Sequence, residues 1–329
     1  MTRRAPRWLT EATAWAASLV LVGGLVGAFS IDGAKPLATP VAQAETPVIE
    51  EIREVRTRVP VQGKKPVVAR PKNKQAPAPA LIPSLGPPPG PQYDAPPARV
   101  AAPEDRYAFL VGITDYRSPT KDTIGSANDV RFIAAMLESR GWLPQNIRVL
   151  TDRQVTGAAV RSGLMWLTAQ SKPGTFTFFH YSGHVKQVGS TVKLWPVDRD
   201  FIPEVEMARL LSGGTGKLWV DIAGCEAGGF AVNLPSERVL FTASSTEAQK
   251  SYEYPEWGQS VWTGLLFDLG TGQGAADANN NGKVTIGEAL RYATYYAQAI
   301  TLNQRPYGRQ TPQAAGDPVR GWTLDAPPA

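Results

Sequence analysis

The sequence predicts an α/β domain with a mostly parallel central sheet, preceded by a membrane segment and a proline-rich linker. From residue 106 onwards, short apolar runs alternate with segments of helical periodicity, which is typical of parallel strands joined by helices. An uncharged apolar stretch occupies residues 12–31, and more than half of the 29 prolines lie in residues 32–103. We therefore divide the chain into residues 1–31, 32–103 and 104–329.

The N-terminal segment has the form of a signal anchor. Arg3, Arg4 and Arg7 precede the uncharged stretch, whose roughly 20 residues are enough to span a bilayer as a helix. Flanking arginines stay in the cytoplasm, so the rest of the chain is expected outside it. The alternative is a cleaved signal peptide, since Ala42-Gln-Ala44 has the small-x-small form of a cleavage site. An uncleaved anchor is favoured because this site lies far from the apolar run.

The segment 32–103 is predicted to be a disordered linker, because proline lacks an amide donor and fixes φ. It also carries the charge imbalance: residues 1–103 hold 13 Lys and Arg against 7 Asp and Glu, whereas residues 104–329 hold 21 against 22. The folded part therefore gives no electrostatic argument for binding nucleic acid. The pattern predicts no particular oligomeric state.

Five apolar runs have the length expected of buried strands, and right-handed crossovers between them imply parallel pairing. Each is rich in β-branched and aromatic residues. The predicted strands are 107–113, 146–151, 175–181, 217–223 and 238–243.

Five segments have helical spacing or helix-start signals. Residues 127–140 repeat apolar side chains at helical intervals before Gly141, and Thr156 is a suitable N-cap for the next helix. The predicted helices are 127–140, 156–170, 204–211, 259–269 and 285–302.

The only cysteine, Cys225, and His184 each follow a predicted buried strand at its C-terminal end. Open α/β sheets place their chemistry at these ends, and a thiol with an imidazole forms a nucleophile and its base. The alternative is that Cys225 is a small buried apolar residue. His180, inside its strand, is interpreted as a packing residue. A single cysteine excludes an internal disulfide.

Several short motifs occur in a specific order, and together they resemble the caspase-like cysteine peptidases, in particular bacterial members related to metacaspases. The resemblance implies a caspase-like three-layer sandwich and a cysteine endopeptidase that acts on proteins or peptides without a cofactor. The motifs are Phe109–Ile113, Ile124–Asp129, Val149–Asp152, Tyr181-Ser-Gly-His184, Trp195–Asp198 and the turn at Cys225.

The resemblance implies His184 as general base and Cys225 as nucleophile, with the N–H groups of Val185 and Cys225 forming the oxyanion hole. It also implies cleavage after Arg or Lys. Asp129, Ser126 and Ser182 match positions of the substrate pocket. Asp221 is a candidate for a second pocket acid, with a structural role as the alternative. The expected location is the bacterial inner membrane, with a single span and the domain in the periplasm, or secretion after cleavage.

Three residues depart from the family pattern. Val185 stands where glycine is usual, Ala223 replaces an acidic residue, and Glu226 follows the cysteine in place of histidine. They motivate an alternative function, a weak or inactive caspase-like binding or scaffold module tethered in the cell envelope. A further alternative is cell-wall attachment through the basic linker.

Residues 277–288 fit the twelve-residue template of a calcium-binding EF-hand loop. Gly282 supplies the sharp turn at the sixth position. The alternative is a turn that caps the following helix without an ion. The predicted ligands are Asp277, Asn279, Asn281, Lys283 through its carbonyl, Thr285 and Glu288.

Overall fold

A computed structural model describes Pro88 and residues 101–231, 234, 237–304, 306–316 and 319–327. The predicted membrane segment and nearly all of the linker lie outside these residues, so both stay predictions. Among the described residues, no helix combines the length and apolar character that crossing a membrane requires.

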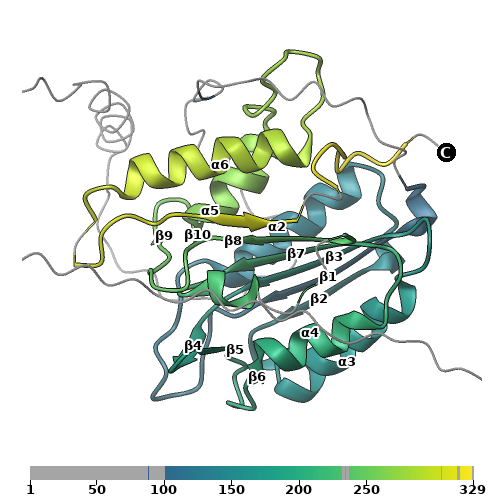
Figure 1. The fold of residues 1–329 in the computed structure, drawn as a ribbon. Helices are drawn as coiled ribbons and strands as arrows, with labels where there is room; N and C mark the ends of the chain where they lie inside the picture. Colours follow the sequence, from purple (N-terminus) through teal and green to yellow (C-terminus); the bar gives the residue numbers. More distant parts are fainter. Residues whose placement is uncertain are drawn as a thin grey trace, which may run out of the picture. The chain divides into compact units, whose positions relative to one another are not determined.

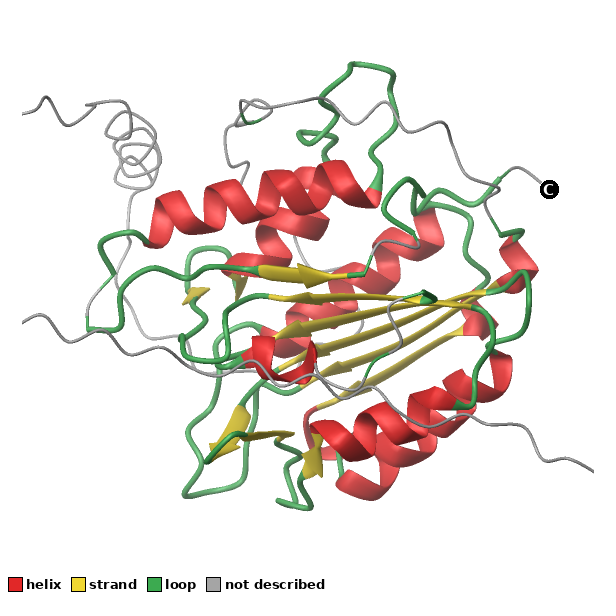
Figure 2. Cartoon of the chain, viewed as in Figure 1, coloured by secondary structure: helices red, strands yellow, loops and turns green. Residues whose placement is uncertain are grey.

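The described domain contains a six-stranded sheet in the order β11-β8-β7-β3-β1-β2. All neighbouring strands pair in parallel except β11, which runs antiparallel to β8 at the edge (Figure 2). A small antiparallel sheet of β4, β5 and β6 and a hairpin of β9 and β10 complete the strands. The strands are β1 (Arg106–Gly112), β2 (Ile147–Thr151), β3 (Phe176–Ser182), β4 (Val185–Val188), β5 (Thr191–Leu194), β6 (Ile202–Pro203), β7 (Lys217–Ala223), β8 (Val239–Ala243), β9 (Glu253–Tyr254), β10 (Gln259–Ser260) and β11 (Gln313–Ala315).

Helices cover both faces of this sheet, as the sandwich prediction requires. Figure 1 shows α2, α5 and α6 on one face and α3 and α4 on the other. The helices are α2 (Ser126–Ser139), α3 (Gly157–Gln170), α4 (Glu204–Ser212), α5 (Val261–Thr263), the π-helix η5 (Gly264–Gly272) and α6 (Ile286–Thr301), with short 3₁₀ turns η1 (Pro103–Asp105), η2 (Pro144–Asn146), η3 (Asp152–Gln154) and η4 (Ala227–Ala231).

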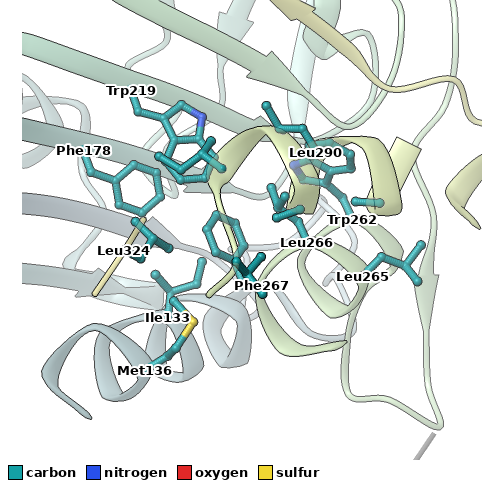
Figure 3. Packing of buried hydrophobic residues seen from close by; sticks show 14 of the residues in the cluster. Ile133, Met136, Phe178, Trp219, Trp262, Leu265, Leu266, Phe267, Leu290 and Leu324 are labelled. Carbon is teal, nitrogen blue, oxygen red and sulfur yellow. The ribbon is translucent and has the colours of Figure 1, made fainter. Parts of the chain in front are cut away.

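Two hydrophobic cores lie on opposite faces of the sheet, because successive strand residues point to opposite sides. Leu110 and Phe178 belong to the core beneath α2, η5 and α6. Their neighbours Phe109 and Phe179 belong to the core beneath α3 and α4. Figure 3 shows the first core, where side chains from the strands meet those of α2 and η5.

Most predicted elements agree with the structure to within two residues at either end. Thr156 caps α3 as expected, because its Oγ1 accepts the Ala159 N–H at 3.1 Å. The predicted helix 259–269 differs at its start. Gln259 and Ser260 pair with β9 instead, and Ser260 then caps α5 by accepting the Thr263 N–H. The helix continues as the π-helix η5.

The sequence analysis missed the short strands β4, β5, β6, β9, β10 and β11. Each has four residues or fewer, which is shorter than the apolar runs from which the long strands were predicted. β11 is also exposed along its whole length, which removes the apolar signal of a buried strand.

Candidate active site

The parallel sheet brings the two predicted catalytic residues to the same edge. Strands β3 and β7 are neighbours, and Ser182 is the register partner of Ala223 at their C-terminal ends. The Gly183 N–H donates to the Ala223 carbonyl at 3.1 Å, so the pairing continues one residue further. His184 and Cys225 each follow the paired residues by two positions. The strand register alone therefore places the imidazole and the thiol on the two neighbouring segments that leave the sheet after β3 and β7.

The surroundings of His184 determine which ring nitrogen is basic. Its Nε2 lies 2.7 Å from the carbonyl oxygen of Lys121. Because a carbonyl only accepts, Nε2 carries the proton in the neutral ring and Nδ1 is left as the proton acceptor. The ring also packs against Tyr116, with centroids 4.6 Å apart, and against Trp195 at 5.8 Å. The imidazole is therefore held in one orientation with one nitrogen ready to accept a proton.

The Cys225 thiol lies in a partly enclosed site. Its Sγ is 3.9 Å from the Ser251 carbonyl oxygen. Burial raises the pKa of the thiol above its ordinary value, and the neighbouring Glu226 carboxylate raises it further, whereas Lys250 lowers it. Glu226 adopts a positive φ of 51° and pairs with Lys250, so its negative charge is partly balanced. The thiol is thus protonated at neutral pH and needs a base to become a nucleophile.

The backbone around Cys225 leaves one amide available for an oxyanion. The Gly224 N–H donates to Ser244 Oγ at 2.9 Å, and the Glu226 N–H donates to the Gln249 carbonyl at 2.8 Å. Between these two engaged amides, the Cys225 N–H has no acceptor among the described residues. This is the group that the sequence analysis predicted as an oxyanion donor.

Val185, the other predicted oxyanion donor, is the first residue of β4 and pairs with Leu194 of β5. The extended backbone of a strand suits a β-branched residue, which explains how valine is accommodated where the family has glycine. Gly183, just before His184, is the position that requires glycine. A Cβ there would lie 2.7 Å from the Tyr116 hydroxyl.

Asp129 and Ser182, two predicted pocket residues, are in direct contact. The Ser182 hydroxyl donates to Asp129 Oδ2 at 2.6 Å, and the Ser260 N–H donates to Oδ1 at 3.1 Å. Asp129 is fully buried, and burial raises its pKa to about 6 despite these donors. A carboxylate held in this way gains from a cationic partner, since a positive charge replaces the lost solvation.

Ser126, the third predicted pocket residue, leads to a site residue that the sequence analysis missed. Its hydroxyl donates to Glu253 Oε1 at 3.2 Å, and the N–H groups of Ile124 and Gly125 donate to the same carboxylate at 2.7 and 3.0 Å. Glu253 is close enough to Cys225 for its charge to raise the pKa of the thiol. It lies more than 120 residues along the chain from Ser126, in a two-residue strand, so no local pattern could have revealed it.

Asp221, the remaining candidate for the pocket, is held by residues of the core. It is fully buried, and its oxygens accept hydrogen bonds from His180 Nδ1 at 2.8 Å, Trp262 Nε1 at 2.9 Å and the Thr242 hydroxyl. All three partners belong to the core rather than to a surface that a substrate could reach. We therefore assign Asp221 a structural role. His180 shares that role, in agreement with its interpretation as a packing residue.

The predicted calcium ligands form a separate group, in the loop between η5 and α6. Asp277, Asn279 and Asn281 accept backbone N–H groups of this same loop. Thr285 and Glu288 form a capping box at the start of α6. No partner of the Lys283 carbonyl is found among the described residues.

Comparisons with known proteins agree with this fold. Residues 105–255 match the family model of the caspase domain. The chain is 35% identical to Metacaspase-1 of Mycosarcoma maydis over 92 residues, which cover 26% of this chain and 23% of that protein. It is 26% identical to Metacaspase-7 of Arabidopsis thaliana over 212 residues, covering 57% of this chain and 52% of that protein.

A solved structure shows the same fold at low sequence identity. A crystal structure of a Geobacter sulfurreducens protein matches with a TM-score of 0.50 and 14% identity, covering 68% of this chain and 99% of that chain. Residues 105–255 thus form a caspase domain, and parts of the chain are similar to metacaspases. The chain spans about half or less of the length of the two metacaspases described above.

Proposed function

We propose that this protein is a cysteine endopeptidase in which Cys225 is the nucleophile and His184 the general base. The observation that carries the proposal is the hydrogen bond between His184 Nε2 and the Lys121 carbonyl, 2.7 Å long. It leaves Nδ1 as the basic nitrogen of the ring. His184 and Cys225 follow the C-terminal ends of the neighbouring strands β3 and β7. A raised thiol pKa makes such a base necessary.

The reaction follows from these positions. His184 Nδ1 takes the thiol proton, and Sγ attacks the substrate carbonyl. The N–H groups of Cys225 and Val185 stabilise the resulting oxyanion, each contributing about 3 kcal/mol. His184 then returns the proton to the leaving amine, which releases the C-terminal product and leaves a thioester. Water, activated by the same nitrogen, hydrolyses the thioester and regenerates the thiol.

For specificity, we propose that the pocket prefers Arg or Lys at the position before the cleaved bond. Asp129 is a buried carboxylate that forms no salt bridge among the described residues, although the charge of His180 lowers its pKa. Glu253 adds a second carboxylate, which compensates for the acid that Ala223 replaces. Two carboxylates in the pocket favour a cationic side chain over an acidic one.

The alternative is a tethered module that binds peptides without cleaving them. Two observations favour it: the thiol contacts the Ser251 carbonyl, and the pKa of Cys225 is raised. Both features describe a thiol that is not activated before substrate binds. Peptide binding that is unchanged in Cys225→Ala, with no turnover by either protein, would favour this alternative.

The test of the proposed function is turnover of a mixed fluorogenic peptide library by the full chain and by Cys225→Ala. We expect cleavage after Arg and Lys that disappears in the variant. No cleavage by a folded chain would contradict the proposal.

The role of Glu253 has its own matched pair of variants. Glu253→Gln should weaken the preference for Arg over a neutral residue, and adding Ala223→Asp should restore it. Glu247→Gln, an exposed change in the preceding loop, is the control and should leave the preference unchanged. A preference that Glu253→Gln does not alter would remove Glu253 from the pocket.

A further inference from the structure

The loop between η5 and α6 folds its side-chain oxygens inwards. Asp277 accepts the N–H groups of Asn281 at 3.1 Å and Gly282 at 2.8 Å. Asn279 Oδ1 also accepts the Asn281 N–H at 3.1 Å, and Asn281 Oδ1 accepts the Lys283 N–H at 2.9 Å. The first, third and fifth positions of the calcium template therefore turn towards the same short stretch of backbone. These bonds alone describe a compact turn and do not require an ion.

Glu288 supplies an independent observation. It is only 1% exposed, and its Oε2 accepts both the N–H and the hydroxyl of Thr285 at 2.8 Å. These two bonds hold the carboxylate against Thr285, the ninth residue of the loop, at the start of α6. Its other oxygen, Oε1, is buried and has no hydrogen-bond partner in the part of the chain that the structure describes. A buried carboxylate oxygen without a donor is costly, so this atom indicates a missing ligand.

The chemistry of the donors selects the ligand. Two carboxylates, two side-chain amides and the backbone carbonyl of Lys283 are hard oxygen donors, which suit Ca²⁺. The described residues contain no group of three or more His, Cys, Asp and Glu side chains that could hold a metal ion. The loop differs from such clusters because amide and carbonyl oxygens supply half of its donors or more.

We propose that residues 277–288 bind one Ca²⁺ ion and that Glu288 provides the ligand at the twelfth position through both oxygens. Asp277, Asn279, Asn281 and the Lys283 carbonyl complete the set, and Thr285 orients Glu288. With only two charged ligands, the affinity belongs to the weak range of such loops, a Kd on the order of 10⁻⁴ to 10⁻³ M.

Bound calcium would stabilise the start of α6. The Ile286 N–H donates to the Trp322 carbonyl and the Gly287 N–H to the Arg320 carbonyl, each at 2.8 Å, so this helix start also anchors the C-terminal segment. The loop adjoins η5 at its other end (Figure 1). Calcium would therefore join η5, α6 and the C-terminal segment, and its effect is on stability rather than on the chemical step.

The test is thermal unfolding of the full chain with and without 10 mM CaCl₂, a concentration of roughly ten times the expected Kd or more. We expect the Tm to rise by roughly 2–4 °C or more with Ca²⁺. The same concentration of MgCl₂ should produce a smaller shift, because Mg²⁺ requires a tighter octahedral site.

Two variants make the result specific to the loop. Glu288→Gln keeps a side chain suited to the capping box, so the Tm without calcium should change little, but the calcium-dependent rise should disappear. Asp277→Asn should remove most of the calcium-dependent rise in Tm. Glu247→Gln, outside the loop, should keep this rise. The proposal is overturned if calcium leaves the wild-type Tm unchanged, or if the rise persists in both Glu288→Gln and Asp277→Asn.

Discussion

The two histidines of this protein lie four residues apart on one chain segment and have opposite surroundings. His180 is fully buried within β3, where Nδ1 bonds to Asp221 and the ring meets Phe267 at 5.6 Å. His184, beyond the end of the same strand, bonds through Nε2 to a backbone carbonyl and presents Nδ1. The core histidine, His180, is paired with Asp221, whose carboxylate is also fully buried. The histidine at the strand end keeps one nitrogen for chemistry, so position relative to the strand end decides the role.

The largest expected effect comes from the same substitution at the two positions. His184→Leu should lower kcat/KM for peptide cleavage by roughly 10² to 10⁴, because the general base is lost. His180→Leu should retain most of the activity at temperatures where it is folded. The measurement is kcat/KM of both variants beside wild type. Equal losses at the two positions would abolish the distinction between them.

For the free energy of unfolding, we expect the larger effect from His180→Leu and the smaller one from His184→Leu. His180→Leu should reduce the free energy of unfolding by about 2–4 kcal/mol, because the buried Asp221 carboxylate loses one of its donors. His184→Leu is the matched control and should change it by less than about 1 kcal/mol, since its side chain lies at the strand exit. Urea unfolding measures both. A stable His180→Leu protein would show that Asp221 does not depend on this partner.

The protonation of Asp129 provides a further test of the site. Asp129 has a pKa of about 6, above its ordinary value, so it is charged above that pH and neutral below it. The kcat/KM for substrates with Arg before the cleaved bond should therefore fall as pH decreases through about 6, more steeply than for neutral substrates. Asp129→Asn should reduce kcat/KM for the Arg substrate on the order of 10²-fold and remove this difference. A difference that persists in Asp129→Asn would assign the titration to another group.

The smallest expected effect concerns the charges beside the thiol. Because burial and Glu226 raise the pKa of Cys225, its alkylation by iodoacetamide should reach half its maximal rate at a higher pH than that of an ordinary thiol. Glu226→Gln should lower this midpoint, and Lys250→Met should raise it, since Lys250 lowers the pKa. Rate measurements are direct because the chain has one cysteine. Midpoints that move in the opposite directions would contradict this account of the charges.

Much of the fold could be predicted from the sequence because the long buried strands carry strong apolar signals. The run of β7 was predicted with its observed limits, Lys217–Ala223. The same apolar signals located the ends of β3 and β7, after which His184 and Cys225 lie. These signals depend on residues close together in the sequence, and they are reliable where a strand is long and fully buried.

Contacts between distant segments could not be predicted in this way. The bond from His184 to Lys121 spans 63 residues, and that from Ser126 to Glu253 spans 127. Period-two alternation gives the face of a strand but not what covers that face, so it could not separate a pocket role of Asp221 from a structural one. Here the face is covered by α5 and η5: Trp262 Nε1 donates to Asp221, and Phe267 packs against Trp219 (Figure 3).

The most direct test of the central claim is covalent labelling of the full chain with a peptidyl electrophile that carries arginine before the reactive group, followed by intact mass measurement. We predict one adduct on wild type, none on Cys225→Ala, and a rate reduced by roughly 10²-fold or more on His184→Leu. His180→Leu should label at a rate close to wild type. Labelling of His184→Leu at the wild-type rate, or no labelling of the folded wild-type chain, would contradict the assignment of Cys225 and His184 as nucleophile and base.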